Sequence, residues 1–106
     1  MTSEAFRVSV RGQVIDFIRQ LPPESRHRMR LAIRGLAHGR GDIKPLDGDL
    51  EGFHRLRVGS YRVVFWYVSS KAGMTVDCVF SERRSVIYLV LEQALRKGLL
   101  KPDRGS

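Results

Sequence analysis

The sequence predicts a single small α+β domain, in which a twisted antiparallel sheet carries an N-terminal helical hairpin on one face and ends in a C-terminal helix. Apolar residues recur at helical spacing in the first half of the chain, whereas strand-like segments follow one another in the second half. With 106 residues and 42% hydrophobic content, the chain can build one core and has little room for a second. The predicted order of elements is β-α-α-β-β-β-α.

The chain opens with a short predicted strand and an amphipathic helix. Residues 5–11 alternate between apolar and polar side chains, with Phe6, Val8 and Val10 on one face. The next apolar residues have the i, i+3, i+4, i+7 spacing of a helix, and they are Val14, Phe17, Ile18 and Leu21. Pro22-Pro23 ends this helix, because neither proline continues the backbone hydrogen-bond ladder.

A second helix is predicted from Pro23 or Glu24 to His38, followed by a loop. Gly39 and Gly41 end this helix. Its apolar stripe is separate from a stripe of arginines that recur every four residues: Arg26, Arg30 and Arg34. Residues 40–52 are rich in Gly, Asp and Pro and are interpreted as a loop.

Two strands follow, at residues 53–58 and 61–68, on either side of Gly59-Ser60. A two-residue Gly-X loop between strands is typical of a type II′ hairpin, because glycine accepts the positive φ at the first position. Residues 61–68 are apolar on both faces and predict a central strand covered on both sides.

Another strand is predicted at residues 74–81 after a turn at residues 69–73, and a helix from about Ser85 to Gly98. Cys78 alternates with Val76 and Phe80 and is interpreted as an inert core thiol. The single domain spans residues 1–106, with residues 89–106 as a C-terminal helical extension whose last residues form a frayed tail.

Composition limits the function. The formal net charge is +8, and 15 of the 19 basic residues are arginine, the side chain best suited to bidentate phosphate contacts. This balance favours an anionic partner such as nucleic acid. A single cysteine excludes an intrachain disulfide framework, and no Walker loop is present. No apolar run approaches the ~20 residues of a membrane span, and no signal peptide opens the chain, so we expect a cytoplasmic protein.

The arginines concentrate where the predicted strands meet. Arg55 and Arg57 are two residues apart and therefore share one face of their strand, and Arg62 lies directly across the turn. The last strand runs into Arg83 and Arg84, and a phenol follows four residues after Arg84, at Tyr88. We expect these side chains to form one anion-binding region.

This pattern resembles the RelE/ParE toxin superfamily. FHRLRVGSYRVVFWYV is similar to the family's hairpin signature, and SERRSVIY is similar to its terminal segment. The loop KPLDGDLEGFHRLR and the early helix that ends in Leu-Pro agree as well. The similarity covers roughly residues 5–88, and the order and spacing of these pieces make it fairly specific.

The resemblance implies a toxin of a toxin–antitoxin pair that enters the ribosome and cuts messenger RNA without a metal or other cofactor. The RNA supplies its own 2′-hydroxyl as nucleophile. The family's catalytic residues carry over onto Arg62, Arg84 and Tyr88, and its phosphate-binding residues onto Arg55, Arg57 and Arg83. The implied partners are an acidic antitoxin, the ribosome and mRNA, with operator DNA bound only through the antitoxin and no membrane.

Some residues depart from the family pattern. Glu82 stands where a basic residue is frequent, and Arg55 and Arg57 stand where ribosome-dependent members carry lysine. Arginine stays protonated and is a poor general base, so the base is not identified. Two alternatives stay open: a ParE-like inhibitor of DNA gyrase, and an inactive module that binds antitoxin and operator DNA.

Each site residue also has a purely structural interpretation. Arg62 would pair with Glu51 or Asp77, and Tyr88 would simply bury its ring. His54 is predicted to point away from the arginines and to pack in the core.

Overall fold

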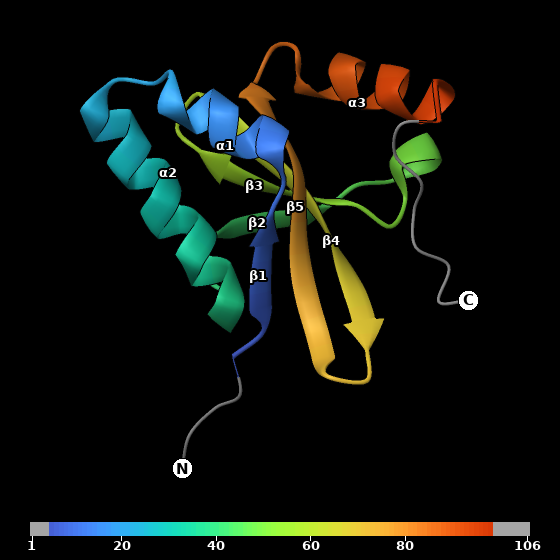
Figure 1. The fold of residues 1–106 in the computed structure, drawn as a ribbon. Helices are drawn as coiled ribbons and strands as arrows, with labels where there is room; N and C mark the ends of the chain where they lie inside the picture. The colour runs from blue at the N-terminus through green and yellow to red at the C-terminus, as the bar shows by residue number, and fades with distance from the viewer. Residues whose placement is uncertain (1–4, 99–106) are drawn as a thin grey trace.

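The computed structural model describes residues 5–98, which form a five-stranded sheet with helices on both faces (Figure 1). The sheet order is β1-β5-β4-β3-β2, and every neighbouring pair is antiparallel except β1 and β5. None of the described helices is long and apolar enough to cross a membrane. The elements are β1 (Arg7–Val10), α1 (Gly12–Arg19), α2 (Pro23–Gly35), β2 (Asp42–Pro45), β3 (His54–Val58), β4 (Tyr61–Ser70), β5 (Gly73–Arg83) and α3 (Ile87–Arg96), with 3₁₀ turns at Leu36–His38 and Gly48–Leu50.

The sheet separates two hydrophobic clusters. On one face, α1 and α2 pack against side chains such as Val63 and Phe65 of β4. On the other face, α3 packs against Val64 and Trp66 of the same strand. Successive residues of β4 thus point to opposite cores, which confirms the predicted central strand covered on both sides.

The helical hairpin forms as predicted. α1 ends at Arg19, before Pro22, and α2 begins with Pro23 at its first position, where a missing backbone N–H costs nothing. The 3₁₀ turn then carries the chain to His38, and Gly39 ends it with a φ of 67°.

The segment interpreted as a loop at residues 40–52 contains a strand, β2, and this prediction was incomplete. β2 pairs with β3, so that Lys44 faces Arg55 and Ile43 faces Leu56. Its sequence DIKP has one half-buried apolar residue, Ile43, and three exposed residues. A four-residue edge strand of this kind carries too little hydrophobic pattern to be recognised before its partner is known.

The hairpin of β4 and β5 is longer than predicted, and β5 contains a bulge. Phe80 pairs with Val64 while Cys78 pairs with Phe65, so one extra residue, Val79, is inserted between them. The bulge moves Phe80 to the face covered by α3, whereas Cys78 stays on the α1–α2 face. Cys78 is fully buried, as predicted, although the bulge places Phe80 on the opposite face.

The C-terminal helix is docked on the sheet. α3 begins at Ile87, and Ile87, Leu91 and Ala94 are buried against the second cluster. It ends before Gly98, which has a φ of 71°. The predicted frayed tail at residues 101–106 lies outside the described residues.

Candidate functional site

Three arginines of β3 and β4 lie on the face of the sheet that α3 covers. Leu56 and Val58 of β3 point into the α1–α2 core, so Arg55 and Arg57 point to the opposite face. Arg57 is paired directly with Arg62 across the hairpin, which places their side chains on the same face. The structure therefore brings these three predicted residues together.

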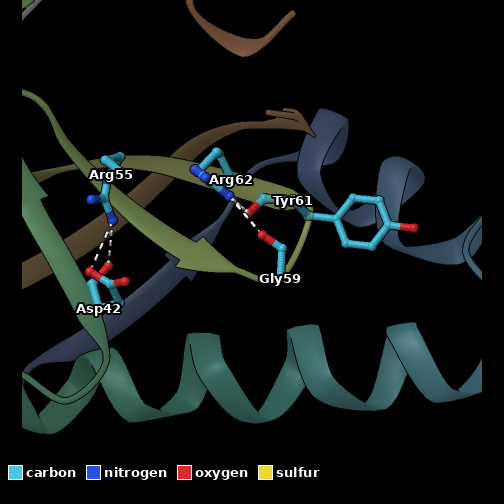
Figure 2. Close-up of polar contacts among 5 residues, drawn as sticks. All are labelled: Asp42, Arg55, Gly59, Tyr61 and Arg62. Atoms are coloured by element: carbon cyan, nitrogen blue, oxygen red, sulfur yellow. Dashed lines mark hydrogen bonds and ion pairs between the residues drawn. The ribbon is translucent and has the colours of Figure 1, made fainter. Parts of the chain in front are cut away.

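Arg62 is buried without a carboxylate partner. Its residue is 7% exposed, and its Nη1 donates to the carbonyls of Gly59 and Tyr61, both at 2.9 Å (Figure 2). No acidic side chain within residues 5–98 lies within 4.0 Å of it. Two carbonyl dipoles hold the guanidinium but leave its charge uncompensated.

Asp77 and Glu51, the two carboxylates considered as structural partners of Arg62, do not form an ion pair with it. Asp77 accepts hydrogen bonds from Arg11 Nη2 and Trp66 Nε1, each at 2.8 Å, and Glu51 forms no ion pair in the described part of the chain. The other guanidinium nitrogens of Arg62 are not fully buried, since a buried nitrogen without a hydrogen-bond partner would be recognised as unsatisfied and neither of them is. They therefore reach the surface and can donate to a ligand.

The electrostatic surroundings of Arg62 show which groups gather around it. Burial lowers its pKa, and the charges of Arg57 and Arg55 lower it further. Tyr88 raises the pKa, and Arg84 lowers it. These five residues (Arg55, Arg57, Arg62, Arg84 and Tyr88) are called the basic cluster below. Their mutual repulsion falls when an anion binds among them.

Arg55 is partly neutralised by β2. Its Nη1 lies 3.1 Å from Asp42 Oδ1 and 3.0 Å from the Asp42 carbonyl oxygen (Figure 2). It also lines a cavity of about 290 Å³ together with Lys44 and Tyr88. Arg55 thus connects the cluster to a hollow that is large enough for a ligand group. Its charged lining residues are two cations, Arg55 and Lys44, and one carboxylate, Asp47, beside the phenol of Tyr88.

Sequence reasoning missed Asp42 and Lys44. Both lie on β2, and they share the face of the arginines because Asp42 is paired with Arg57 and Lys44 with Arg55. The one available signal was the alternation of side-chain direction along DIKP. It does not show which face Asp42 and Lys44 share until the register of β2 with β3 is known.

The end of β5 separates the two adjacent arginines. The backbone N–H of Arg84 donates to the carbonyl of Ser60 at 2.9 Å, which fixes Arg84 beside the β3–β4 turn. Arg83 is paired with Tyr61, whose ring lies in edge contact with Phe17 on the α1 side. Because paired residues share a face, the side chain of Arg83 lies on the opposite face from Arg62. The structure does not bring Arg83 into the cluster.

Glu82 is the acidic residue paired directly with Arg62 in the sheet. Its Oε1 accepts a hydrogen bond of 2.9 Å from the backbone N–H of Arg83. This bond directs its carboxylate toward its own strand, and no ion pair with Arg62 forms.

Tyr88 lies in the first turn of α3 and is half-buried. Its ring packs against the cluster that contains Phe53 and Trp66, two rings stacked at 4.8 Å between centroids. It also lines the cavity beside Arg55. The ring is thus anchored on one side and accessible on the other, as required of a group that stacks on a base or transfers a proton.

His54 lies on the other face, as predicted, and the core thiol of Cys78 lies on that face too. His54 stacks on Phe65 at 5.4 Å and contacts Tyr67 at 5.1 Å, and its buried Nδ1 has no hydrogen-bond partner within residues 5–98. Burial lowers its pKa. Burial and the neighbouring Asp77 raise the pKa of Cys78 to about 12, so its thiol stays protonated and is not a nucleophile.

Comparison with known proteins gave matches among solved structures alone: no family model and no curated protein matches the chain. A YoeB/ParE toxin from Agrobacterium tumefaciens has a TM-score of 0.61 and 17% identity, covering 74% of this chain and 99% of that one. The RelBE2 toxin–antitoxin complex from Mycobacterium tuberculosis has a TM-score of 0.51 and 25% identity, with coverage of 76% and 99%. An archaeal RelE–RelB complex from Pyrococcus horikoshii has a TM-score of 0.53 and 23% identity, with coverage of 76% and 96%.

The chain therefore has the fold of RelE, YoeB and ParE toxin structures over about three quarters of its length. This confirms the fold that the sequence resemblance implied. The matches include toxins of more than one branch, so they do not separate a RelE-like from a ParE-like protein.

Proposed function

We propose that the protein is the toxin of a toxin–antitoxin pair and cleaves messenger RNA on the ribosome, in the cytoplasm, without a metal or cofactor. The observation that carries this proposal is Arg62, a buried cation that lies among three other arginines and a tyrosine and has no carboxylate partner within residues 5–98. A folded protein keeps such a group when an anionic partner compensates it. The phosphodiester of RNA is an anion of the right chemistry.

The reaction needs three tasks from the protein. The 2′-hydroxyl of the RNA attacks the adjacent phosphorus, its proton leaves to a base, and the 5′-oxygen of the next nucleotide departs with a proton. This breaks one P–O bond, forms another, and leaves a 2′,3′-cyclic phosphate and a 5′-hydroxyl. Negative charge grows on the phosphate oxygens in the transition state, and fixed cations stabilise it there.

The residues divide between these tasks by position. Arg62 is held rigidly by the turn carbonyls, and Arg84 is tied beside it, so these two are assigned to the developing phosphorane charge. Arg55 and Arg57 bind the flanking phosphates from β3. Tyr88 stacks on a base or protonates the leaving oxygen. Arg83 is left out of the site, because its side chain is on the other face.

The partner that restrains this activity is proposed to be an acidic antitoxin. The matched structures include RelB–RelE complexes, among them one described as a toxin–antitoxin complex. A net charge of +8 favours an acidic partner through electrostatic steering. Operator DNA would be contacted only through that partner.

Inhibition of DNA gyrase is the second candidate, because the matched toxin from Agrobacterium tumefaciens is described as YoeB/ParE. The basic cluster favours cleavage over this alternative, since an inhibitor that only binds has no use for a positioned tyrosine beside converging arginines. An inactive module that binds antitoxin and DNA is the third outcome that an assay must recognise.

A reconstituted translation reaction tests the proposal. The purified protein is added, and the 5′ ends of the mRNA are mapped with and without ribosomes, beside Arg62→Ala and Tyr88→Phe. The same preparation enters a gyrase supercoiling assay. We expect new cuts at the A-site codon that need ribosomes and are lost or much reduced in both variants.

Intact mRNA together with blocked supercoiling would move the protein to the gyrase-inhibitor class. If a folded sample neither cleaves mRNA nor blocks supercoiling, the enzymatic proposal is wrong, and the inactive binding module remains. Cuts that persist without ribosomes would contradict ribosome dependence while leaving the nuclease assignment in place.

A further inference from the structure

A second basic hollow lies on the other side of the β3–β4 turn. It has a volume of about 190 Å³ and opens between α2 and the turn. Its lining consists of Ser25, Arg28, Val58, Gly59, Ser60 and Tyr61, and so contains one cation, three hydroxyl-bearing residues and no carboxylate. This composition is that of an anion site with hydroxyl donors.

Arg28 lies flat against the turn. A methyl group placed on Gly59 would be 3.4 Å from its Nη2, 3.8 Å from Nη1 and 3.9 Å from Cζ. These are ordinary van der Waals distances, so the guanidinium lies directly beside the turn. Arg28 makes no ion pair and no side-chain hydrogen bond within residues 5–98, so its donors are available.

The hollow is contiguous with the basic cluster through the turn itself. Arg62 Nη1 donates to the Gly59 carbonyl, and the Arg84 N–H donates to the Ser60 carbonyl. The two residues that form the turn are therefore held by the cluster and also line the hollow. A bound chain that crosses the turn passes from one cationic region directly to the other.

The size of the hollow fits one phosphate group. At about 190 Å³, the volume is many times the ~10–15 Å³ of such space that a single water needs. A phosphate group has five non-hydrogen atoms, which leaves room for hydration. A polynucleotide supplies a series of such groups along one strand.

We propose that Ser25, Arg28 and the Gly59-Ser60 turn form a second phosphate-binding subsite, which holds a backbone phosphate of RNA on the side of the turn opposite to Arg62. The subsite rests on the proposed function for its ligand, RNA, but it makes no contact with the reacting atoms. Arg28 is assigned to RNA binding alone. Its substitution would therefore change the cleavage rate only by changing the affinity for RNA. The phosphate belongs either to the cleaved message or to ribosomal RNA, since both present the same group.

Binding measurements without cleavage test the subsite. Arg28→Ala, Arg28→Lys and Arg30→Ala are titrated with a fluorescent single-stranded RNA oligonucleotide over a salt series, and with vacant ribosomes by co-sedimentation. Arg30 is the matched control, because it also lies on α2 but lines the groove toward α1. We expect Arg28→Ala to weaken binding by about threefold or more and to reduce the salt slope by about 0.7, with Arg28→Lys intermediate and Arg30→Ala unchanged.

The two titrations, one with the oligonucleotide and one with vacant ribosomes, identify which RNA supplies the phosphate. A loss with the oligonucleotide assigns it to the message, and a loss with ribosomes alone assigns it to ribosomal RNA. Arg28→Ala equal to Arg30→Ala in both arms would overturn the subsite. A wild-type protein that binds RNA through Arg28 but never cleaves would refute the proposed function and leave the subsite standing.

Discussion

At the scale of single residues, burial has opposite consequences for two basic side chains, the buried Arg62 and the partly buried His54. Arg62 keeps its charge because a guanidinium does not deprotonate in a protein, so burial leaves a cation that no carboxylate within residues 5–98 compensates. His54 can lose its charge, and burial among aromatic rings favours the neutral form. The first group is therefore prepared to bind an anion, whereas the second is a structural residue.

His54 predicts a dependence of stability on pH. Burial lowers its folded-state pKa below the ordinary value of 6.5, so the unfolded chain binds the proton more readily. The contribution of neutral His54 is fully present above about pH 6.5 and is lost as the pH falls through the folded-state pKa. Chemical denaturation at several pH values should show wild type losing stability on acidification relative to His54→Phe, which keeps the stacking.

A difference between wild type and His54→Phe that does not change with pH would contradict this interpretation of His54. The other two histidines, His27 and His38, are exposed and are present in both proteins, so they cancel in the comparison.

At the scale of elements, α3 links the site to the stability of the fold. Its buried residues pack on the sheet, and the same helix carries Tyr88 over the arginines. Loosening α3 therefore disturbs both the core and the position of the phenol.

Leu91→Ala should destabilise the protein by about 2–5 kcal/mol, because Leu91 is fully buried and its truncation leaves a cavity. Leu89→Ala is the matched control on the same helix: Leu89 is 59% exposed, and its truncation should change the unfolding free energy by about 0.5 kcal/mol or less. Urea denaturation of the three proteins measures both effects. Equal stability of Leu91→Ala and wild type would show that α3 is not docked in solution.

The elements also show what the sequence can and cannot predict. Helices α1 and α2 and strands β3 and β4 were predictable because prolines, glycines and apolar periodicity mark them locally. β2 was not, because its pairing with β3 is a contact between segments with no local signal. The same limit applies to the site: Arg55, Arg57 and Arg62 follow from alternation and a two-residue turn, whereas Lys44 needed the register of β2, and the face of Arg83 needed the course of β5 beyond its bulge.

At the scale of the whole molecule, the net charge of +8 is distributed so that one face of the sheet concentrates arginines from separate strands. This field steers an anionic chain toward the cluster before any specific contact forms. The anionic chain then meets the basic cluster on one side of the β3–β4 turn and Arg28 on the other side.

Binding of RNA should depend steeply on salt. If the four arginines of the basic cluster each neutralise one phosphate of a single strand, the logarithm of the association constant falls with the logarithm of salt concentration with a slope of about −3. Fluorescence anisotropy over a salt series measures it. A slope near zero would mean that the arginines do not contact phosphates.

The face of the sheet that carries Arg62 is proposed to cleave RNA, and Arg83 provides the sharpest control. Arg83 and Arg84 are adjacent and equally basic, but their positions differ: Arg83 is paired with Tyr61, whereas the Arg84 charge acts on Arg62. Arg62 also supports the turn, so the exposed Arg84 supplies a variant that should stay folded.

The decisive measurement is the rate of ribosome-dependent mRNA cleavage by Arg62→Ala, Arg84→Ala and Arg83→Ala, with the unfolding midpoint of each recorded. The proposed site predicts that Arg62→Ala and Arg84→Ala each lose about a hundredfold or more, as expected when a transition-state cation is removed, while Arg83→Ala stays within about threefold of wild type. Folded Arg62→Ala and Arg84→Ala proteins that cleave at the wild-type rate would contradict it.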